Sequence, residues 1–396
     1  MSSEVRPTPG TDGDGAAGPI APNGRIRVLL LIKGLGRGGA ENLLLHATQL
    51  RDTSSFDYEV AYLLPWKTAL VGDIHDVGVP VHLLSGARVY DLRWAVRLRR
   101  LLASRPFDVM HIHSPYVAGI ARIAARTLPR RLRPRLMSTE HLPWSGYKTA
   151  TRILNAATFR LDAAHVAVSH AVRDSIPKPL RGGVRPLVHG IPIEPARTQL
   201  KLRAAVRREL AIAPDELLIG TVASMARQKG YFYLLDAARL VLDRHPEVRF
   251  AAVGQGPLED EIRRRHRELG LGDRFLLLGP RDRATDFIAA CDLFALSSLY
   301  EGLPLVIMEA LTLGVPVVGT SVTGITELVD HDVQGLLVPA ARPDLFADAL
   351  SALVSDPERR ARMARAAASC AERFDNRRAV RTLEAMYREL AGARRG

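Results

Sequence analysis

The chain has 396 residues, of which 47% are hydrophobic, and this is enough for two domains that each bury their own core. Its two cysteines, Cys291 and Cys370, provide neither a disulfide framework nor the spacing of a metal site. The formal charge is +13, and much of the excess lies between Arg88 and Arg135, where twelve arginines accompany two acids. Such a segment attracts anionic surfaces, although codon composition is an alternative source of the arginines.

The first 24 residues are rich in Gly, Pro and Ala and contain hardly any large apolar residues, so we expect a disordered N-terminal tail. This tail lacks the apolar core of a signal peptide. No uninterrupted apolar run in the chain reaches the roughly 20 residues that are needed to cross a bilayer. We therefore expect a cytoplasmic protein, either free or peripheral at the inner face of the membrane.

From residue 25 onward, apolar runs of strand length alternate with amphipathic stretches, a rhythm typical of βαβ units. The strands predicted in the first half are Ile26–Ile32, Tyr58–Leu64, Val79–Leu83, Asp108–His113, Arg135–Thr139 and Ala164–Val168. Pro and Gly then become frequent between His189 and Pro195, before a basic amphipathic helix at Leu200–Leu210. We therefore predict a domain boundary at residue 195.

The same rhythm resumes in the second half and ends in helices. The strands predicted there are Leu217–Ala223, Val248–Val253, Phe275–Leu278, Leu293–Leu296, Val315–Gly319 and Gly335–Val338. After Pro343 the pattern is helical through Tyr387. We predict an α/β protein with two doubly wound, Rossmann-like parallel sheets, in domains at 25–195 and 196–375, and a C-terminal helix at 376–396 that crosses back. The carboxyl ends of both sets of strands would face one interdomain cleft.

A glycine-rich loop follows the first strand. Three of its glycines match the dinucleotide-binding fingerprint: Gly34, Gly36 and Gly39. That fingerprint also expects an acid at the end of the second strand, whereas the acid found there, Glu59, stands near its beginning. The pattern favours a loop of Gly36, Gly38 and Gly39 that closes over a sugar-phosphate ligand of the opposite domain. A nicotinamide-linked oxidoreductase and a simple packing turn are the alternatives.

A basic helix is predicted at residues 92–101. Its apolar side chains share one face and its arginines another: Trp94, Leu98 and Leu101 against Arg93, Arg97 and Arg100. Helices of this kind can lie on anionic lipid. The alternative is a helix that packs its apolar side chains on its own sheet and leaves a solvated basic face.

Histidines stand at the ends of two predicted strands of the first half. His111 and His113 point to one face of their strand because strand side chains alternate. A metal site and simple hydrogen bonds to the backbone are the alternatives, and no third ligand is placed by the sequence. His141 directly follows its strand, at the edge where parallel sheets present functional groups. We predict that His141 contacts the ligand, with loop ordering as the alternative.

A basic turn follows the first strand of the second half and contains Arg227 and Lys229. An ammonium on a flexible stem is a mobile point charge that suits a pyrophosphate, and an arginine can add a forked contact. Positive charge there would stabilise a departing diphosphate more than the bound one. A solvated basic turn is the alternative for either residue.

Two glutamates, Glu301 and Glu309, are separated by seven residues that read as a turn and a helix start. Gly302 marks the turn and Pro304 the first helical position, and Gly314 with Pro316 ends the helix. The unpaired N–H groups of the first turn, at Leu305, Val306 and Ile307, would face a phosphate. We predict that Glu309 accepts hydrogen bonds from a ribose diol and that the loop carboxylate of Glu301 holds sugar hydroxyls.

Taken together, these segments resemble the retaining nucleotide-sugar glycosyltransferases of the GT-B type, family four. The matching segments are Gly38-Gly39-Ala40-Glu41, Asp108-Val109-Met110-His111-Ile112-His113, Ser138-Thr139-Glu140-His141, Val166-Ala167-Val168-Ser169, His189-Gly190-Ile191, Lys229-Gly230, Val253-Gly254-Gln255-Gly256-Pro257 and the block from Glu301 through Gly335. The resemblance implies that Glu309 binds the donor ribose, Glu301 the transferred sugar and Lys229 the diphosphate. It places His141 near the reacting carbon.

The resemblance also implies the activity, which is transfer of a hexosyl group from a nucleoside-diphosphate sugar to an acceptor hydroxyl with retained configuration. No metal or cofactor and no nucleic-acid partner is expected. The expected acceptor is a glycan or a lipid-linked glycan of bacterial surface polysaccharide or glycolipid synthesis, and the basic segment suggests an anionic membrane surface. A catalytically idle scaffold protein and an oxidoreductase are the alternatives.

Two positions depart from the family pattern. Ser224 stands where members usually carry an arginine, so Arg227 would have to replace it or the diphosphate would be held less tightly. The hinge reads His189-Gly190-Ile191-Pro192 instead of the common Asn-Gly-Ile-Asp. The second change is expected to alter only the linker.

Overall fold

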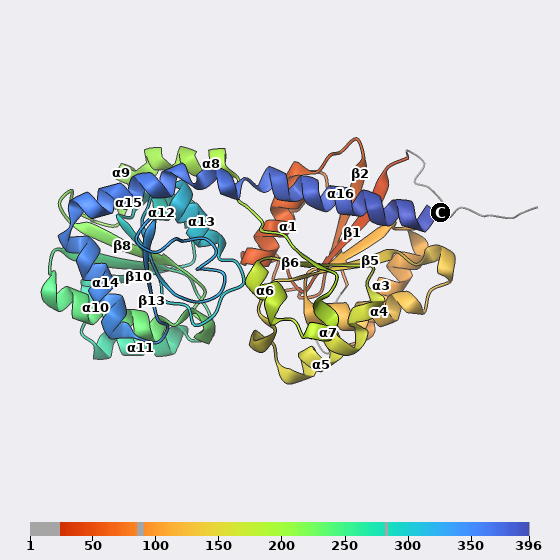
Figure 1. The fold of residues 1–396 in the computed structure, drawn as a ribbon, viewed down its shortest axis with the longest axis horizontal. Coiled ribbons are helices and arrows are strands. Elements are labelled where there is room, and N and C mark those ends of the chain that lie inside the picture. The colour runs from red at the N-terminus through yellow and green to blue at the C-terminus, as the bar shows by residue number, and fades with distance from the viewer. Residues whose placement is uncertain (1–23, 85–90, 282–283, 396) are drawn as a thin grey trace, which may run out of the picture.

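The computed structural model describes residues 24–84, 91–281 and 284–395 of the chain. Two parallel sheets lie in separate halves of the molecule, each flanked by helices (Figure 1). The expected tail at 1–24 falls almost wholly outside the described residues, and so does Arg88 at the start of the arginine-rich segment. The fold is α/β with two Rossmann-like domains, as the sequence predicted.

The first sheet has seven strands in the order β3-β2-β1-β4-β5-β6-β7, and its strands pair in parallel. They are β1 (Ile26–Ile32), β2 (Phe56–Tyr62), β3 (Val81–Leu83), β4 (Val109–Ile112), β5 (Arg135–Glu140), β6 (Ala164–Ala167) and β7 (Val184–Pro186). The strand order reverses beside β1, which is where ligands bind in such sheets. The edge strand β7 was not predicted, because three residues that end in proline carry no alternation signal.

Helices cover both faces of this sheet. They are α1 (Gly39–Leu50), α2 (Val71–Asp76), α3 (Arg93–Ser104), α4 (Pro115–Arg126), α5 (Thr149–Thr158), α6 (His170–Ser175) and α7 (Lys178–Arg181). In α3, Trp94 and Leu98 are 1% and 0% exposed and belong to the core beneath the sheet. The apolar face of the basic helix is therefore used for packing, as in the second of the two alternatives.

The second sheet has six parallel strands in the order β10-β9-β8-β11-β12-β13. They are β8 (Leu217–Val222), β9 (Val248–Val253), β10 (Phe275–Gly279), β11 (Leu293–Leu296), β12 (Val317–Thr320) and β13 (Gly335–Val338). Its helices are α8 (Ile193–Arg197), α9 (Arg203–Glu209), α10 (Tyr231–Arg244), α11 (Glu259–Glu268), α12 (Ala284–Ala290), α13 (Leu305–Thr312), α14 (Pro343–Ser355) and α15 (Pro357–Ser369). One continuous apolar core joins them.

The chain passes between the two halves twice, and the two passages pair with each other. The Ile191 amide donates to the Phe374 carbonyl at 2.8 Å, and the Asn376 amide donates to the Ile191 carbonyl at 3.3 Å. A side chain at Gly190 would overlap the Phe374 carbonyl oxygen, so only glycine fits this crossing. The hinge is thus two extended segments held side by side.

After the second passage, the long helix α16 (Asn376–Arg395) runs back along the first domain (Figure 1). Its side chains Leu383, Met386 and Tyr387 are buried in the core on one face of the first sheet. The C-terminal helix therefore completes the first domain. Among the described residues, no helix is both long enough and apolar enough to span a membrane.

Candidate active site

The carboxyl ends of the two sheets meet at an interface between the domains. A Cβ atom at Gly302, in the loop after β11, would overlap the carbonyl oxygen of His141, in the loop after β5. A Cβ atom at Gly146 would stand 3.2 Å from the ring of Tyr300. The residues that the sequence placed on opposite domains therefore lie in direct contact.

A third contact joins the domains through Glu327, in the loop after β12. Its carboxylate accepts hydrogen bonds from the backbone amides of His170 and Ala171 at 3.0 and 2.8 Å. These amides open α6, where the helix has no internal partners for them and where negative charge is favoured. No sequence pattern singled out this glutamate, because the amides that it contacts lie about 150 residues away along the chain.

Glu301 and Lys229 form an ion pair. The Lys229 Nζ donates to Glu301 Oε1 at 2.5 Å, and the Ser298 hydroxyl donates to the same oxygen at 2.6 Å. The other oxygen accepts from Gln228 Nε2 at 3.3 Å. Glu301 is 4% exposed, so this pairing supplies the counter-charge that a buried carboxylate requires. The sequence assigned the two side chains to different parts of a ligand and did not predict their pairing.

Arg227 lies two residues before Lys229 in the sequence, and both Arg227 and Ser224 are exposed. Both lie in the turn between β8 and α10, which is closed by Gly230 at a positive φ of 63°. A side chain at Gly230 would overlap the Ser297 carbonyl oxygen, so glycine is required there. The exposed Arg227 guanidinium stands on the same turn as Lys229 and can swing toward a ligand held there.

Helix α13 begins at Leu305, one residue later than predicted, because Pro304 caps the helix in an extended conformation instead of opening it. The Ile307 amide donates to the Pro304 carbonyl at 3.1 Å, so the three amides expected to face a ligand reduce to those of Leu305 and Val306. Glu309 is half-buried, and its Oε2 is covered without a hydrogen-bond partner. Burial raises the pKa of Glu309 to about 7. A carboxylate in this state is ready to accept donors such as hydroxyl groups.

On the first domain, three histidines form a row. The rings of His111 and His113 lie with centroids 4.1 Å apart and planes tilted by 40°, which agrees with the predicted common face. His113 Nδ1 lies 3.2 Å from His141 Nε2. His111 is held on both sides, by the Tyr387 hydroxyl of α16 at 2.6 Å and the Thr139 hydroxyl at 2.7 Å.

The imidazoles of this row are neutral at physiological pH. Burial lowers the pKa of His111 to about 3, and it lowers the pKa values of His113 and His141 well below the usual range. Burial also lowers the pKa of His189, in the hinge, to about 4. Within the residues that the structure describes, no group of three or more His, Cys, Asp or Glu side chains is arranged to hold a metal. Neutral imidazoles can exchange hydrogen bonds with sugar hydroxyls.

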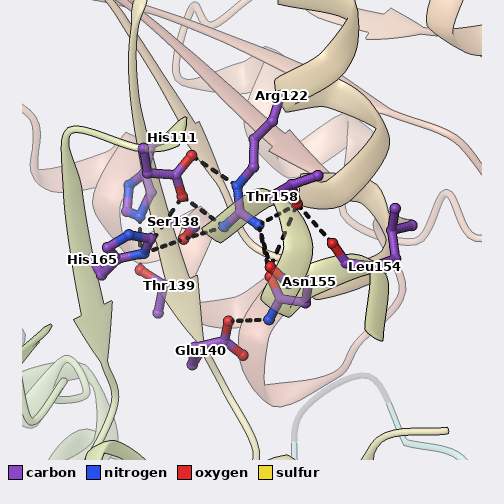
Figure 2. A network of polar contacts seen from close by, with 10 residues as sticks. His111, Arg122, Ser138, Thr139, Glu140, Leu154, Asn155, Thr158 and His165 are labelled. Atoms are coloured by element: carbon purple, nitrogen blue, oxygen red, sulfur yellow. Dashed lines mark hydrogen bonds and ion pairs between the residues drawn. The ribbon is translucent and has the colours of Figure 1, made fainter. Parts of the chain in front are cut away.

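A buried polar network reaches Glu140, the residue before His141 in the chain (Figure 2). The Arg122 guanidinium, which is 0% exposed, is paired with Asp162 at 2.6 Å and donates to Asn155 Oδ1 at 2.7 Å. Asn155 Nδ2 then donates to Glu140 Oε1 at 2.7 Å. Because Glu140 immediately precedes His141, this network fixes the end of β5 and the backbone from which His141 departs.

The glycine loop joins β1 to α1, and α1 begins at Gly39. A Cβ atom at Gly39 would have open space around it, so this glycine does not serve the close helix–strand packing of a dinucleotide fold. Glu59, the acid of β2, pairs with His82 at 2.6 Å and with Arg105 at 3.1 Å. Glu59 is thus already paired with basic side chains at its own strand, so this acid is not offered to a ribose beside the loop.

Two family models match consecutive parts of the chain. Residues 26–189 match the model described as Glycosyltransferase Family 4, and residues 203–369 match Glycosyl transferases group 1. The two matched segments coincide with the two sheets and meet at the hinge.

Curated relatives and solved structures agree with these matches. A putative glycosyltransferase, EpsF, from Bacillus subtilis is 27% identical over 77% of this chain and 81% of its own length. A UDP-Gal:alpha-D-GlcNAc-diphosphoundecaprenol alpha-1,3-galactosyltransferase from Escherichia coli is 25% identical, over 70% of this chain and 74% of its own. The structure of Anabaena HepE with UDP and glucose superposes with a TM-score of 0.81 at 22% identity, over 92% of this chain and 100% of that one, and shows the likeness of fold.

Proposed function

Because the chain belongs to the family-four, group 1 glycosyltransferases with the GT-B fold, we propose that it transfers a hexosyl group from a nucleoside-diphosphate sugar to an acceptor hydroxyl. The transfer retains the anomeric configuration and needs no metal. The observation that carries the proposal is the convergence of Lys229, Glu301 and the start of α13 at one edge of the second sheet. UDP and UDP-glucose complexes of a similar fold support the donor class.

In this proposal, Glu309 accepts hydrogen bonds from the donor ribose, and the amides of Leu305 and Val306 face the diphosphate. Lys229 changes partner when the donor enters. Its ammonium moves from Glu301 to the diphosphate, with Arg227 as the second cation, and Glu301 becomes free to accept sugar hydroxyls. The ion pair of the empty site keeps both charges compensated until the ligand replaces them.

His141 is assigned to the sugar near the reacting carbon, where a neutral imidazole positions a hydroxyl without adding charge. The loop of Gly36, Gly38 and Gly39 closes over the same ligand from the first domain. We assign the nucleophile's role to no carboxylate among the described residues, so departure and attack are assigned to one face of the sugar. Positive charge beside the leaving diphosphate lowers the barrier because negative charge grows there.

For the acceptor we propose a glycan or a lipid-linked glycan of surface polysaccharide synthesis. One relative acts on a diphosphoundecaprenol acceptor and another is named for amylovoran biosynthesis. The membrane contribution of α3 is electrostatic in this proposal, because Trp94 and Leu98 are in the core while Leu92 and Val96 are exposed among arginines. Equal sedimentation with neutral and anionic vesicles at low salt would remove the membrane from the proposal.

The test of the function is a thermal-shift panel of UDP, GDP and ADP and their sugars, followed by turnover. We expect one nucleoside diphosphate to raise the melting temperature. At a concentration of 100 Kd, its binding should add about 2.7 kcal/mol to the free energy of unfolding. Turnover should survive EDTA, and NMR of the product should show retained configuration. No shift with any nucleotide would favour a scaffold protein, and a product of inverted configuration would reject the mechanism.

A further inference from the structure

The chain uses lysine rarely. Six of its 55 basic side chains are lysines, and the remainder are arginines. One of the six, Lys229, lies in the proposed donor site. Three more lie together on the first domain, and we call them the lysine triad: Lys33, Lys67 and Lys148. In a sequence so strongly biased toward arginine, four of six lysines at two places suggest that a compact ammonium is needed there.

The first two members of the triad stand on loops that are tied together. Lys33 follows β1 and Lys67 lies in the loop after β2. The Leu64 amide donates to the Lys33 carbonyl at 3.0 Å, and the Leu35 amide donates to the Lys67 carbonyl at 2.8 Å. The Lys67 side chain lies across Gly34, where a Cβ atom would stand 3.0 Å from it. Both ammonium groups are therefore based at the carboxyl edge of the first sheet.

The third member approaches from the loop that follows His141. Lys148 directly precedes α5 and lies two residues beyond Gly146, which faces Tyr300 of the second domain. Burial lowers the pKa of Lys33, and the charges of Lys67 and Lys148 lower it further, so both of these side chains lie within electrostatic reach of Lys33. The triad thus stands beside the domain interface, on the side of the first domain.

The triad is not neutralised by the protein. All three lysines are exposed, and within the described part of the chain none of them has an ion pair or a side-chain hydrogen bond. The nearby acid, Glu41, turns back over Gly38 at the start of α1. Three like charges and one acid leave a local excess of positive charge. Such a cluster is unfavourable alone and is relieved by a multivalent anion.

We propose that the lysine triad binds a phosphoryl group carried by the acceptor. This inference rests on the proposed transfer reaction and adds the chemical class of the acceptor to it. The donor diphosphate already has Lys229 and the α13 amides on the opposite domain, so the triad offers a second anion site on the acceptor side. Three ammonium groups on flexible stems can converge on one phosphoryl group, where planar guanidinium groups are bulkier. Trp66, 61% exposed beside Lys67, offers a flat surface to the sugar or lipid that carries it.

The first experiment uses inorganic pyrophosphate as the probe, titrated by calorimetry into protein whose donor site is saturated with the nucleotide found in the thermal-shift panel. We expect one binding event that weakens about threefold to tenfold in each of Lys33→Gln, Lys67→Gln and Lys148→Gln, from the loss of one charged contact. The matched controls are Lys178→Gln and Lys201→Gln, which remove exposed lysines elsewhere and should leave the affinity unchanged.

The second experiment separates the sources of the phosphoryl group. Turnover is compared for a soluble sugar 1-phosphate, a short-chain lipid diphosphate sugar in micelles, and the same sugars without phosphate. The triad variants should raise KM for a phosphorylated acceptor about threefold to tenfold and leave kcat and the unphosphorylated sugars unchanged. Lys67→Arg keeps the charge and should restore part of the affinity, and the better of the two phosphorylated acceptors identifies the source.

Three results would overturn the proposal. They are no pyrophosphate binding to the nucleotide-saturated protein, equal losses in the triad and control variants, and weaker nucleotide binding in the triad variants, which would assign the lysines to the donor. If no nucleotide binds at all, the transfer function fails separately. Pyrophosphate titration of Lys229→Ala protein then still tests the anion site alone.

Discussion

The two sides of the site treat charge in opposite ways. On the second domain, a full ion pair between Lys229 and Glu301 is buried and hydrogen-bonded before any ligand arrives. On the first domain, burial depresses the pKa values of the His113 and His141 imidazoles, so these rings are neutral. The ion pair can exchange ionic partners, whereas the row of histidines presents uncharged hydrogen-bonding groups.

This difference matches the chemistry that we assign to each side. Charge develops on the departing diphosphate, so mobile cations belong on the donor side. The sugar and the attacking hydroxyl remain close to neutral, and a fixed cation next to them would favour the ground state of an anionic ligand as much as the transition state. The comparison therefore predicts large effects from breaking the ion pair and smaller, pH-dependent effects from the neutral groups.

The largest effect is expected from Lys229→Ala. Turnover should fall about 100- to 1,000-fold, as for the loss of one charge-stabilising donor. The variant also leaves Glu301 buried without its cation, which should cost about 1–3 kcal/mol of unfolding free energy. The double variant Lys229→Ala/Glu301→Gln should recover stability in denaturant titration and remain inactive. Full activity in the single variant would show that the ion pair is only structural.

The next effect comes from Gly302→Ala, which places a methyl group against the His141 carbonyl and separates the two sides. Turnover should fall about 10- to 100-fold, because a displacement of about 1 Å is enough for such losses. Small-angle scattering should show a more open molecule, while each domain stays folded. Gly72→Ala, where a Cβ atom meets open space, is the control. Unchanged turnover would mean that this contact is not part of the working state.

Glu309→Gln tests the neutral carboxyl of the donor side. The folded pKa of Glu309, about 7, exceeds its ordinary value of 4.5, so the fold favours the protonated form. That stabilisation is complete below about pH 4.5 and is lost as the pH rises through 7. Relative to Glu309→Gln, the wild-type protein should lose on the order of 2 kcal/mol between pH 5 and 8 in denaturant titration. A constant difference across this range would reject the raised pKa.

The smallest effect concerns His189, whose pKa burial lowers to about 4. Its stabilisation as a neutral ring is complete above about pH 6.5 and is lost as the pH falls through 4. Compared with His189→Asn, the wild-type protein should lose about 1 kcal/mol between pH 6.5 and 5.5. The neighbouring His46 provides a comparison, because burial lowers its pKa to about 4 as well, so His46→Asn should show the same pH dependence. Parallel stability curves would show that the ring is not held neutral.

The sequence predicted the part of the site on the second domain well, because the residues of that part follow one another in a single segment of the chain. A strand, a turn and a helix start follow one another from Leu293 to Thr312, and local signals of glycine and proline placed the helix start within one residue. Strands β1, β9, β11 and β13 have the predicted bounds because they are apolar runs, which a single arginine interrupts in β1 and in β9. The edge strand β7 lacks such a run and was missed.

The pairings between distant segments were outside the reach of sequence patterns. The contact of Lys229 with Glu301 spans 72 positions, and that of Glu327 with the start of α6 spans more than 150. Such contacts depend on loop geometry and on the angle between the domains, neither of which leaves a periodic signal. Only part of the row of histidines was predicted. Strand alternation placed His111 and His113 on one face, but it carries no information about the contact between His113 and His141, which follow different strands.

The return of α16 to the first domain has a consequence for the order in which the protein matures. Leu383, Met386 and Tyr387 cover one face of the first sheet, and Tyr387 holds His111. The first domain must therefore wait for α16, which is made after the second domain, before its core is closed. A fragment that ends at the hinge would expose that face, whereas the second half, whose core is contiguous in the chain, can fold while synthesis continues. The second domain can therefore complete its core before the first domain does.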